Sequence, residues 1–270
     1  MAMRSLQTYA GGRCLEPSWA FHRLPHPRKT IRKRTNLQPA FGWKLTRCAP
    51  GQFVMAWLPG IDERPFSISD NDPIRITVAD VGSFSHALNQ LQPGDHLWLR
   101  GPLGKGFMPR GHSHLLLGGG YGAAPLNFLA KSLCAQGDQV GVCLGARSCA
   151  DLLFVGEFES LDCQVWLATE DGSAGKQGLL TALLPEAQNA LKPETIYACG
   201  PIGMLLAIAA LARTAGLPAQ LSFESVMRCG VGLCGSCELP EETCQQLGLT
   251  PGFLVCHDGP VGEISTNHSK

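Results

Sequence analysis

The sequence predicts three consecutive parts: a small antiparallel β-barrel, a doubly wound α/β sheet domain and a compact cysteine-rich lobe. Short strands separated by Gly and Pro turns run from about residue 51 to residue 99, as in a small antiparallel barrel. Apolar strands then alternate with helices from about residue 112, which is typical of a parallel sheet covered on both faces. A glycine-rich loop with three cysteines, residues 229–237, marks the third part.

Alternating apolar and polar side chains indicate the strands of the barrel, and Gly and Pro residues indicate its turns. We expect strands over 52–58, 66–69, 74–78 and 96–99, with a short helix over 85–91. The segment Arg64-Pro65-Phe66-Ser67 has two interpretations. An Arg and a Ser beside an aromatic ring can hold a diphosphate and stack on a ligand ring. The same segment is equally compatible with an ordinary strand that carries a surface Arg.

The α/β part begins at a continuous apolar run that ends at Leu117, as expected of a strand buried on both faces. Strand-like and helix-like segments alternate from there to residue 223, which predicts a doubly wound parallel sheet. The expected strands are 113–117, 139–144, 163–168, 195–198 and 219–223, and the expected helices are 124–136, 150–158, 178–184 and 202–215.

Three strand-to-helix junctions in this part are rich in small residues. In Gly118-Gly-Gly-Tyr-Gly-Ala-Ala-Pro125, small residues let the backbone approach a pyrophosphate at the N-terminus of the next helix. Taken alone, this run is also compatible with a plain tight turn, because it is not a regular G-x-G-x-x-G motif. Cys199-Gly200-Pro201 and residues 169–173 fall at the same carboxyl edge of the sheet. Together the three junctions predict a nucleotide site at that edge.

The cysteines of the third part have the spacing C-x4-C-x2-C, followed by Cys256 after a gap of 18 residues. This is the ligand spacing of a plant-type [2Fe-2S] cluster, which four thiolates hold. Glycines between the cysteines let backbone N–H groups turn toward the cluster. His257 beside Cys256 leaves a zinc site open, although zinc sites usually pair two C-x2-C units. Disulfides are a third alternative, with poor geometry for cysteines so close together.

Composition excludes several classes of protein. The 270 residues carry 22 Lys+Arg and 22 Asp+Glu, and this zero net charge argues against a strongly basic nucleic-acid binder. No apolar stretch reaches the roughly 18–20 residues that a membrane helix needs. Several of the 12 cysteines, such as Cys143, lie in apolar runs and are most simply buried free thiols, which suits a reducing cytoplasm. Residues 1–45 show no persistent pattern and are expected to form a poorly ordered or atypical tail.

In their order along the chain, these motifs resemble those of the electron-transfer subunit of NAD-dependent dihydroorotate dehydrogenase. The resemblance runs from about residue 51 to residue 261, and the cysteine loop at the C-terminal end separates this family from ordinary ferredoxin reductases. The gap between Cys237 and Cys256 is somewhat longer than in the family, and residues 1–50 lack its usual opening strands. The matching motifs are Arg64-Pro-Phe-Ser67, Gly82-Ser-Phe-Ser85, Gly101-Pro-Leu-Gly-Lys-Gly-Phe107, Gly118-Gly-Gly-Tyr-Gly-Ala-Ala-Pro125, Thr169-Glu-Asp-Gly-Ser173, Cys199-Gly-Pro201, the cysteine loop and Cys256-His-Asp-Gly-Pro-Val261.

The resemblance implies a ferredoxin-reductase-like fold: a tail over 1–45, an FAD-binding barrel over 46–110, an NAD-binding domain over 111–222 and a [2Fe-2S] lobe over 223–270. No residue stands out as a general base. The implied FAD-binding residues are Arg64, Pro65, Phe66, Ser67, Thr77, Val78, Ala79, Phe84 and Ser85. The implied NAD-binding residues are Gly118, Gly119, Gly120, Gly122, Cys199, Gly200 and Pro201. The implied cluster ligands are Cys229, Cys234, Cys237 and Cys256.

The function implied by the resemblance is electron transfer in pyrimidine biosynthesis. Dihydroorotate would be oxidised at the FMN of a partner catalytic subunit, in a heterotetramer, and electrons would pass through the cluster and FAD to NAD. One alternative is a related reductase subunit that serves a hydrogenase, a sulfide-linked or a ferredoxin-linked enzyme. An alternative of another class is a zinc-stabilised interaction module without redox work. Arg147 and Ser148 leave the choice between NAD and NADP open in the sequence, and we follow the family in expecting NAD.

Overall fold

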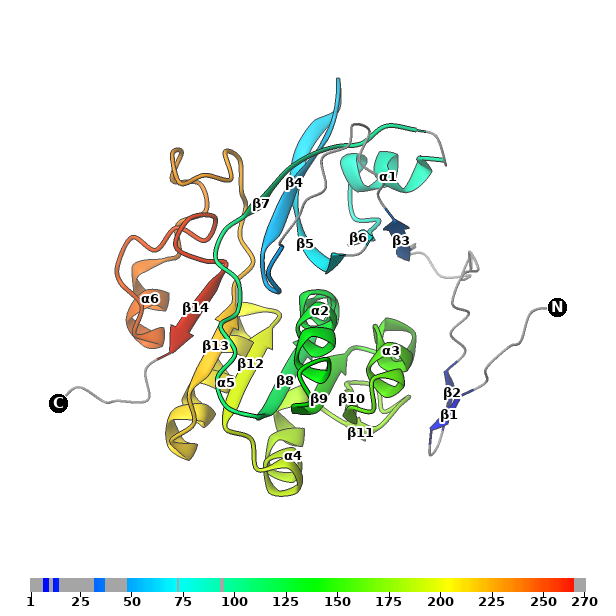
Figure 1. The fold of residues 1–270 in the computed structure, drawn as a ribbon, viewed down its shortest axis with the longest axis vertical. Coiled ribbons are helices and arrows are strands. Elements are labelled where there is room, and N and C mark those ends of the chain that lie inside the picture. Colours follow the sequence, from blue (N-terminus) through cyan, green and yellow to red (C-terminus); the bar gives the residue numbers. More distant parts are fainter. Residues whose placement is uncertain are drawn as a thin grey trace.

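The computed structural model (Figure 1) describes residues 48–71, 73–92 and 95–264, together with the backbone of three short strands before them. Two of these strands, β1 (Gln7–Tyr9) and β2 (Gly12–Cys14), pair with each other. The third, β3 (Arg32–Asn36), pairs antiparallel with a strand of the barrel. The expected tail over 1–45 therefore contributes β3 to the barrel sheet. Apart from β1, β2 and β3, the tail lies outside the described residues.

The first part is a five-stranded antiparallel sheet in the order β3-β6-β5-β4-β7. The predicted strands and helix are all present. Strand β5 is longer than predicted because it begins before Pro65, which lies opposite Met55 of β4. Beyond β3 the elements are β4 (Phe53–Leu58), β5 (Asp62–Asn71), β6 (Ile74–Ala79), α1 (Ser83–Gln90) and β7 (Trp98–Leu103).

The second part is a seven-stranded sheet in the order β11-β10-β9-β8-β12-β13-β14. All neighbouring strands are parallel except β14, which runs antiparallel to β13 at one edge. The C-terminal lobe thus sends its last strand into this sheet, a pairing that the sequence did not predict. The strands are β8 (Ser113–Gly119), β9 (Gln139–Ala146), β10 (Gln164–Thr169), β11 (Lys176–Gln177), β12 (Thr195–Cys199), β13 (Ala219–Ser222) and β14 (Val261–Ile264).

The helices follow the predicted order with two changes of length. The helix predicted over 150–158 is a 3-10 turn followed by a short α-helix, because Phe154 adopts a left-handed conformation (φ 63°) between them. The helix predicted over 178–184 is a 3-10 helix over 180–183, and the α-helix follows it from Leu184 to Leu191 with Pro185 at a tolerated position in its first turn. The helical elements are η1 (Gly120–Gly122), α2 (Ala123–Cys134), η2 (Cys149–Asp151), α3 (Val155–Ser160), η3 (Leu180–Leu183), α4 (Leu184–Leu191), α5 (Ile202–Ala215) and α6 (Glu241–Leu247).

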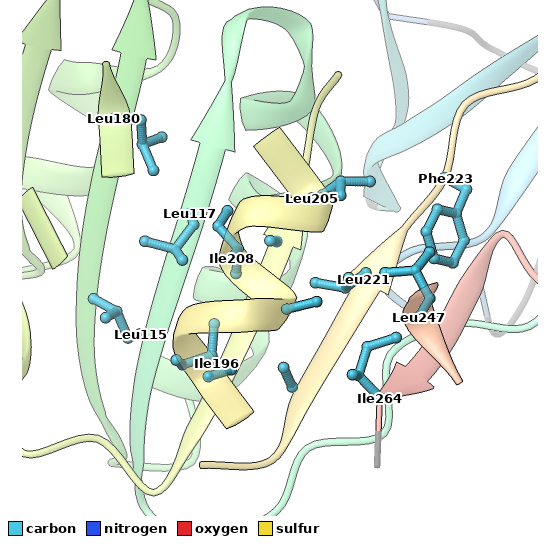
Figure 2. Close-up of a cluster of buried hydrophobic side chains, with 14 of the residues drawn as sticks. Leu115, Leu117, Leu180, Ile196, Leu205, Ile208, Leu221, Phe223, Leu247 and Ile264 are labelled. Carbon is cyan, nitrogen blue, oxygen red and sulfur yellow. The ribbon is translucent and has the colours of Figure 1, made fainter. Parts of the chain in front are cut away.

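Helices cover both faces of the seven-stranded sheet. Along β8, Leu115 and Leu117 belong to the cluster with α4 and α5, whereas Leu116 belongs to the cluster with α2 and α3. Figure 2 shows the first cluster, in which Ile208 of α5 lies against the strands and Leu247 of α6 extends the cluster toward the C-terminal lobe. The lobe is therefore continuous with the core of the sheet domain rather than a separate unit.

Helix α2 also joins the sheet domain to the barrel. The Asn127 side-chain amide donates a hydrogen bond to the Ser69 carbonyl (3.1 Å), and the Lys131 ammonium pairs with Asp70 (2.5 Å). Phe128 on the same helix lies in the hydrophobic core of the barrel. These contacts place α2 between β5 and the sheet. Within the part of the chain that the structure describes, no helix is long and apolar enough to cross a bilayer.

Candidate functional site

Two of the three predicted junctions meet at the carboxyl edge of the sheet. Strands β8 and β12 are neighbours, and Gly118 lies opposite Cys199. The approach is close: a Cβ on Gly122 would lie 1.9 Å from the Cys199 carbonyl oxygen, so only glycine fits there. Helix α2 begins directly after Gly122, so its positive N-terminal end lies at this meeting point. Residues 169–173 follow β10, which β9 separates from β8.

A pocket of about 270 Å³ lies next to this edge, between the barrel and the sheet domain. Its barrel wall contains four of the predicted FAD-binding residues, Pro65, Phe66, Ser67 and Thr77. The sheet domain and the segment before the cysteine loop form the remaining walls. The other lining residues are Phe53, Tyr121, Ala124, Phe223, Glu224, Ser225, Met227 and Pro260.

The barrel wall of this pocket carries a polar atom that the protein leaves unused. The Thr77 hydroxyl oxygen is buried and has no hydrogen-bond partner among the described residues. Buried hydroxyls are almost always satisfied, so this one indicates a place for a polar group of a ligand. Phe66, whose ring stacks on Phe84 at a centroid distance of 6.1 Å, adds an aromatic surface on the same wall. A flat aromatic ligand with polar ring edges matches this lining.

The remaining predicted FAD residues do not line the pocket. Arg64 is about half exposed and pairs with Asp62 at 2.5 Å, and Val78 is fully buried in the barrel core. The Ser85 hydroxyl accepts hydrogen bonds from the Val81 and Gly82 amides (both 3.0 Å) and so caps the start of α1. Ala79 ends β6, and Phe84 is buried in the barrel core. Their roles toward FAD stay predictions.

Glu224 is the most informative pocket residue that sequence reasoning missed. Its side chain is exposed along the pocket, yet the surrounding protein desolvates the carboxyl group and raises its pKa. Burial also raises the pKa of the neighbouring Cys199 thiol to about 12, and the Glu224 charge adds to this rise. Cys199 is therefore a neutral thiol at physiological pH. Glu224 belongs to no recognised motif, and its only signal was its position between the last predicted strand and the cysteine loop.

The four predicted cluster ligands converge as two pairs. The Sγ atoms of Cys237 and Cys256 lie 3.2 Å apart, and Cys229 and Cys234 form the second interacting pair. Backbone amides aim at these sulfurs: Gly232 N–H donates to Cys256 Sγ (3.1 Å) and Leu233 N–H donates to Cys229 Sγ (3.3 Å). Glycines 230, 232 and 235 have φ values of 70°, 81° and 71°, which is the left-handed conformation expected of the loop.

These surroundings favour thiolates in the outer pair. Hydrogen bonds from Ser236 lower the pKa of Cys234 to about 6, and the Val231 amide lowers the pKa of Cys229. In the inner pair, burial and the neighbouring Cys237 raise the pKa of Cys256 to about 12. A metal that binds all four sulfurs therefore displaces a proton from Cys256.

A short antiparallel contact holds the inner pair in place. Leu239 N–H donates to the Phe253 carbonyl (3.0 Å), and Val255 N–H donates to the Cys237 carbonyl (3.1 Å). Helix α6 lies within the long gap between the two cysteines and packs its Cys244 and Leu247 into the core. The helix thus accounts for much of the gap that the sequence analysis found longer than in the family.

The geometry favours an iron–sulfur cluster over a single zinc ion. The His257 ring is hydrogen-bonded to Asp258 (3.0 Å) and lies against Gly232, so the donor set is four sulfurs in two pairs. Two pairs of thiolates fit a two-iron cluster, in which each iron takes two terminal sulfurs.

Comparison with known protein families identifies the two C-terminal parts. Residues 224–265 match the model of the iron–sulfur cluster binding domain of dihydroorotate dehydrogenase B, which supports iron rather than zinc at the cysteine loop. Residues 116–210 match the model of the oxidoreductase NAD-binding domain, which includes both glycine junctions of β8 and β12.

Curated relatives and a solved structure agree with these matches. The chain is 42% identical over 215 residues to a probable dihydroorotate dehydrogenase B (NAD(+)) electron transfer subunit from Thermococcus kodakarensis, covering 80% of this chain and 84% of the relative. It is 36% identical over 244 residues to the corresponding protein of Methanopyrus kandleri, covering 88% and 89%. A structure of NADH-dependent reduced ferredoxin-NADP oxidoreductase matches with a TM-score of 0.69 and 30% identity, covering 80% of this chain and 78% of that one. The chain therefore belongs to the family of dihydroorotate dehydrogenase B (NAD(+)) electron transfer subunits.

Proposed function

We propose that this chain carries electrons from the FMN of a dihydroorotate dehydrogenase catalytic subunit through a [2Fe-2S] cluster and FAD to NAD, in pyrimidine biosynthesis. One observation carries the proposal. The pocket has walls from the barrel, from the β8–α2 junction and from the segment that leads into the cysteine loop. A flavin in this pocket borders the NAD edge on one side and the cluster loop on the other.

FAD, the cluster and NAD are the cofactors of this subunit, and the described residues fit them in three places. Bound flavin exchanges hydride with NAD and single electrons with the cluster, which makes it the converter between the two. Phe66 and the free Thr77 hydroxyl would orient its ring system. The glycines of 118–122 would admit the NAD diphosphate at the N-terminus of α2. Cys199, at the end of β12 beside these glycines, is a neutral thiol.

The cysteine loop supplies both the cluster ligands and a surface for the partner. Leu233, immediately before the second cysteine of the loop, has 85% of its surface exposed, and Val231 has 43% exposed. Exposed apolar side chains around a redox centre are what a subunit interface requires. We assign this surface, called the cluster-loop face, to the FMN-containing catalytic subunit, with two copies of each subunit in a heterotetramer.

Co-expression with the catalytic subunit tests the proposal. The untagged partner is expected to co-purify, and the complex is expected to reduce NAD when dihydroorotate is added. Its mass in solution then reports the stoichiometry. Co-purification without dihydroorotate-dependent NAD reduction would contradict the proposed donor. In that outcome, NADH-dependent reduction of a ferredoxin by the isolated subunit would favour the alternative of a ferredoxin-linked reductase, which the solved neighbour suggests.

A further inference from the structure

Two free cysteines away from the cluster lie in contact with each other. Cys134 is the last residue of α2, and Cys163 follows α3 immediately before β10. Their Sγ atoms are 3.8 Å apart. A disulfide needs an S–S separation of about 2.0 Å, so closing the pair requires the two sulfurs to approach each other by about 2 Å.

The backbone around the pair holds both thiols in this position. The Cys163 amide donates to the Phe158 carbonyl (3.1 Å), in a turn where Asp162 has a left-handed φ of 58°. Cys163 is 9% exposed, whereas Cys134 is half-buried and is the member that solvent can reach. An entering reagent therefore meets Cys134 first, with Cys163 directly behind it.

The electrostatic surroundings divide the roles of the two sulfurs. The hydrogen bond from the Cys163 thiol lowers the pKa of Cys134 and outweighs burial and the carboxylates of Asp138 and Asp162, which raise it. The same interaction, together with burial, raises the pKa of Cys163. Cys134 is thus the thiolate that attacks, and Cys163 is the protonated thiol that resolves the product.

We propose that Cys134 and Cys163 form a reversible redox site in which a low-molecular-weight disulfide such as glutathione disulfide closes a Cys134–Cys163 bond. In the first step, the Cys134 thiolate attacks one sulfur of glutathione disulfide, forms a mixed disulfide and releases one glutathione thiolate. In the second step, Cys163 loses its proton and attacks Cys134 Sγ, which releases the second glutathione. The protein loses two electrons and two protons, and one glutathione disulfide becomes two glutathione molecules.

The bond would anchor the C-terminal end of the helix on which the site depends. The N-terminal end of α2 follows Gly122 and lines the pocket through Ala124, and Asn127 and Lys131 hold β5 of the barrel. Closing the disulfide restricts the unfolded chain across the 134–163 loop and ties α2 to the turn after α3. The consequence is a sheet domain whose stability depends on the thiol redox state of its surroundings.

Peptide mapping of the holoprotein tests this site. The protein, with cluster and flavin absorption intact, is equilibrated in glutathione buffers of increasing oxidised fraction, alkylated and digested with trypsin. The peptide 132–147 also carries Cys143, and the peptide 148–176 also carries Cys149, which is disulfide-bonded, so fragment ions must locate the bond. We expect a Cys134–Cys163 link, with Cys143 remaining a thiol because it is fully buried. The melting temperature should rise by about 5 °C or more on closure.

Two variants separate the roles of the sulfurs. Cys163→Ser should accumulate the mixed disulfide of glutathione on Cys134, and Cys134→Ser should leave Cys163 unmodified at the same ratios. Neither variant should show the rise in melting temperature. The proposal is overturned if fragment ions show both residues as thiols in the most oxidising buffer, or if either is linked to a different cysteine. The wild-type peptide map alone tests whether the Cys134–Cys163 bond forms, so the test holds even if a variant fails to fold.

Discussion

At the scale of single residues, one hydrogen-bonding side chain in the cysteine loop changes the pKa of a predicted cluster ligand. Ser236 hydrogen-bonds Cys234 at 3.1 Å, and Cys234 is exposed at the outer end of the loop. Its pKa is lowered to about 6, and it is the most exposed of the four predicted ligands. The predicted ligand roles of Cys229, Cys234, Cys237 and Cys256 agree with their convergence and await a direct test.

Replacing one ligand should separate the two halves of the electron path. In Cys234→Ser, cluster absorption should be lost, because one iron lacks a thiolate. Electrons should then no longer leave FAD toward the cluster. NADH should still reduce FAD, since the pocket and the β8–α2 junction are unchanged. Visible absorption and anaerobic NADH titration measure the two effects. Cys134→Ser is the matched control and should keep the cluster; unchanged cluster absorption in Cys234→Ser would show that the ligand assignment is wrong.

A second residue-scale prediction concerns pH at the opposite edge of the sheet. His112 is hydrogen-bonded to Asp138 at 2.8 Å, which raises the pKa of His112 and lowers that of Asp138. His112 stabilises the folded state fully below its ordinary pKa of 6.5, and this stabilisation is lost as pH rises through its raised pKa. Asp138 stabilises the folded state fully above its ordinary pKa of 3.8, and this stabilisation is lost as pH falls through its lowered pKa.

The pair should therefore stabilise the protein most between pH 3.8 and pH 6.5. Melting temperatures of wild type and His112→Gln, measured across this range and up to pH 9, should differ most inside the window and converge above it. The difference should be small, because the His112 side chain is 92% exposed. A difference that grows from pH 7 to pH 9 would contradict the assigned pairing.

At the scale of elements, the junctions depend on backbones that touch. Gly122→Ala would place a methyl group against the Cys199 carbonyl oxygen, so β8–α2 and β12–α5 must move apart. We expect a loss of roughly 1–3 kcal/mol in the free energy of unfolding, as for an overpacked core, and weaker binding of NADH. Chemical denaturation and NADH titration measure these changes.

Gly203→Ala provides the matched control for stability. It lies in the first turn of α5, and a Cβ there meets nothing within 4 Å. Alanine is the better helix former, so stability should be unchanged or rise by up to about 1 kcal/mol. Equal effects of the two substitutions would mean that the close approach at Gly122 does not hold the junction together.

At the scale of the whole molecule, the cluster loop lies at an outer surface while the pocket lies between the parts. In Figure 1 the segment that carries the cysteines lies on one side of β4 and β5, and α1 lies on the other side. The cluster-loop face and α1 therefore lie on opposite sides of the barrel sheet. The pocket between the parts has walls from the barrel, from the β8–α2 junction and from the segment before the cysteine loop.

A charge on the cluster-loop face should weaken the complex without harming the subunit. Leu233→Glu is expected to reduce affinity for the catalytic subunit at least tenfold, because a carboxylate would be buried in an apolar contact. Val81→Glu is the control, since Val81 is 80% exposed and lies two residues before α1, which is on the other side of the barrel. Affinity is measured by titration with the purified partner. Retained affinity in Leu233→Glu would place the interface elsewhere.

The sequence by itself determined the order of the parts and the ligand spacing of the cysteine loop. Apolar runs identify β8, β9, β10, β12 and β13 because strands buried on both faces need them, whereas the exposed pair that forms β11 was not predicted. Helix α5 agrees with its predicted bounds. The spacing from Cys229 to Cys237 identifies the cluster loop because three ligands on one turn allow few alternatives. Both patterns involve residues that are close together in the sequence, so they can be recognised without knowing the fold.

Only the tertiary structure decided which residues line the pocket and which thiols meet. Glu224, Ser225 and Met227 belong to no motif and line the pocket only because the barrel, the sheet and the lobe pack together. The pairing of β14 with β13 depends on contacts between distant segments, as does the contact of Cys134 with Cys163. Burial, desolvation and the distances between side chains depend on how such distant segments pack, so they cannot be read from the order of residues along the chain.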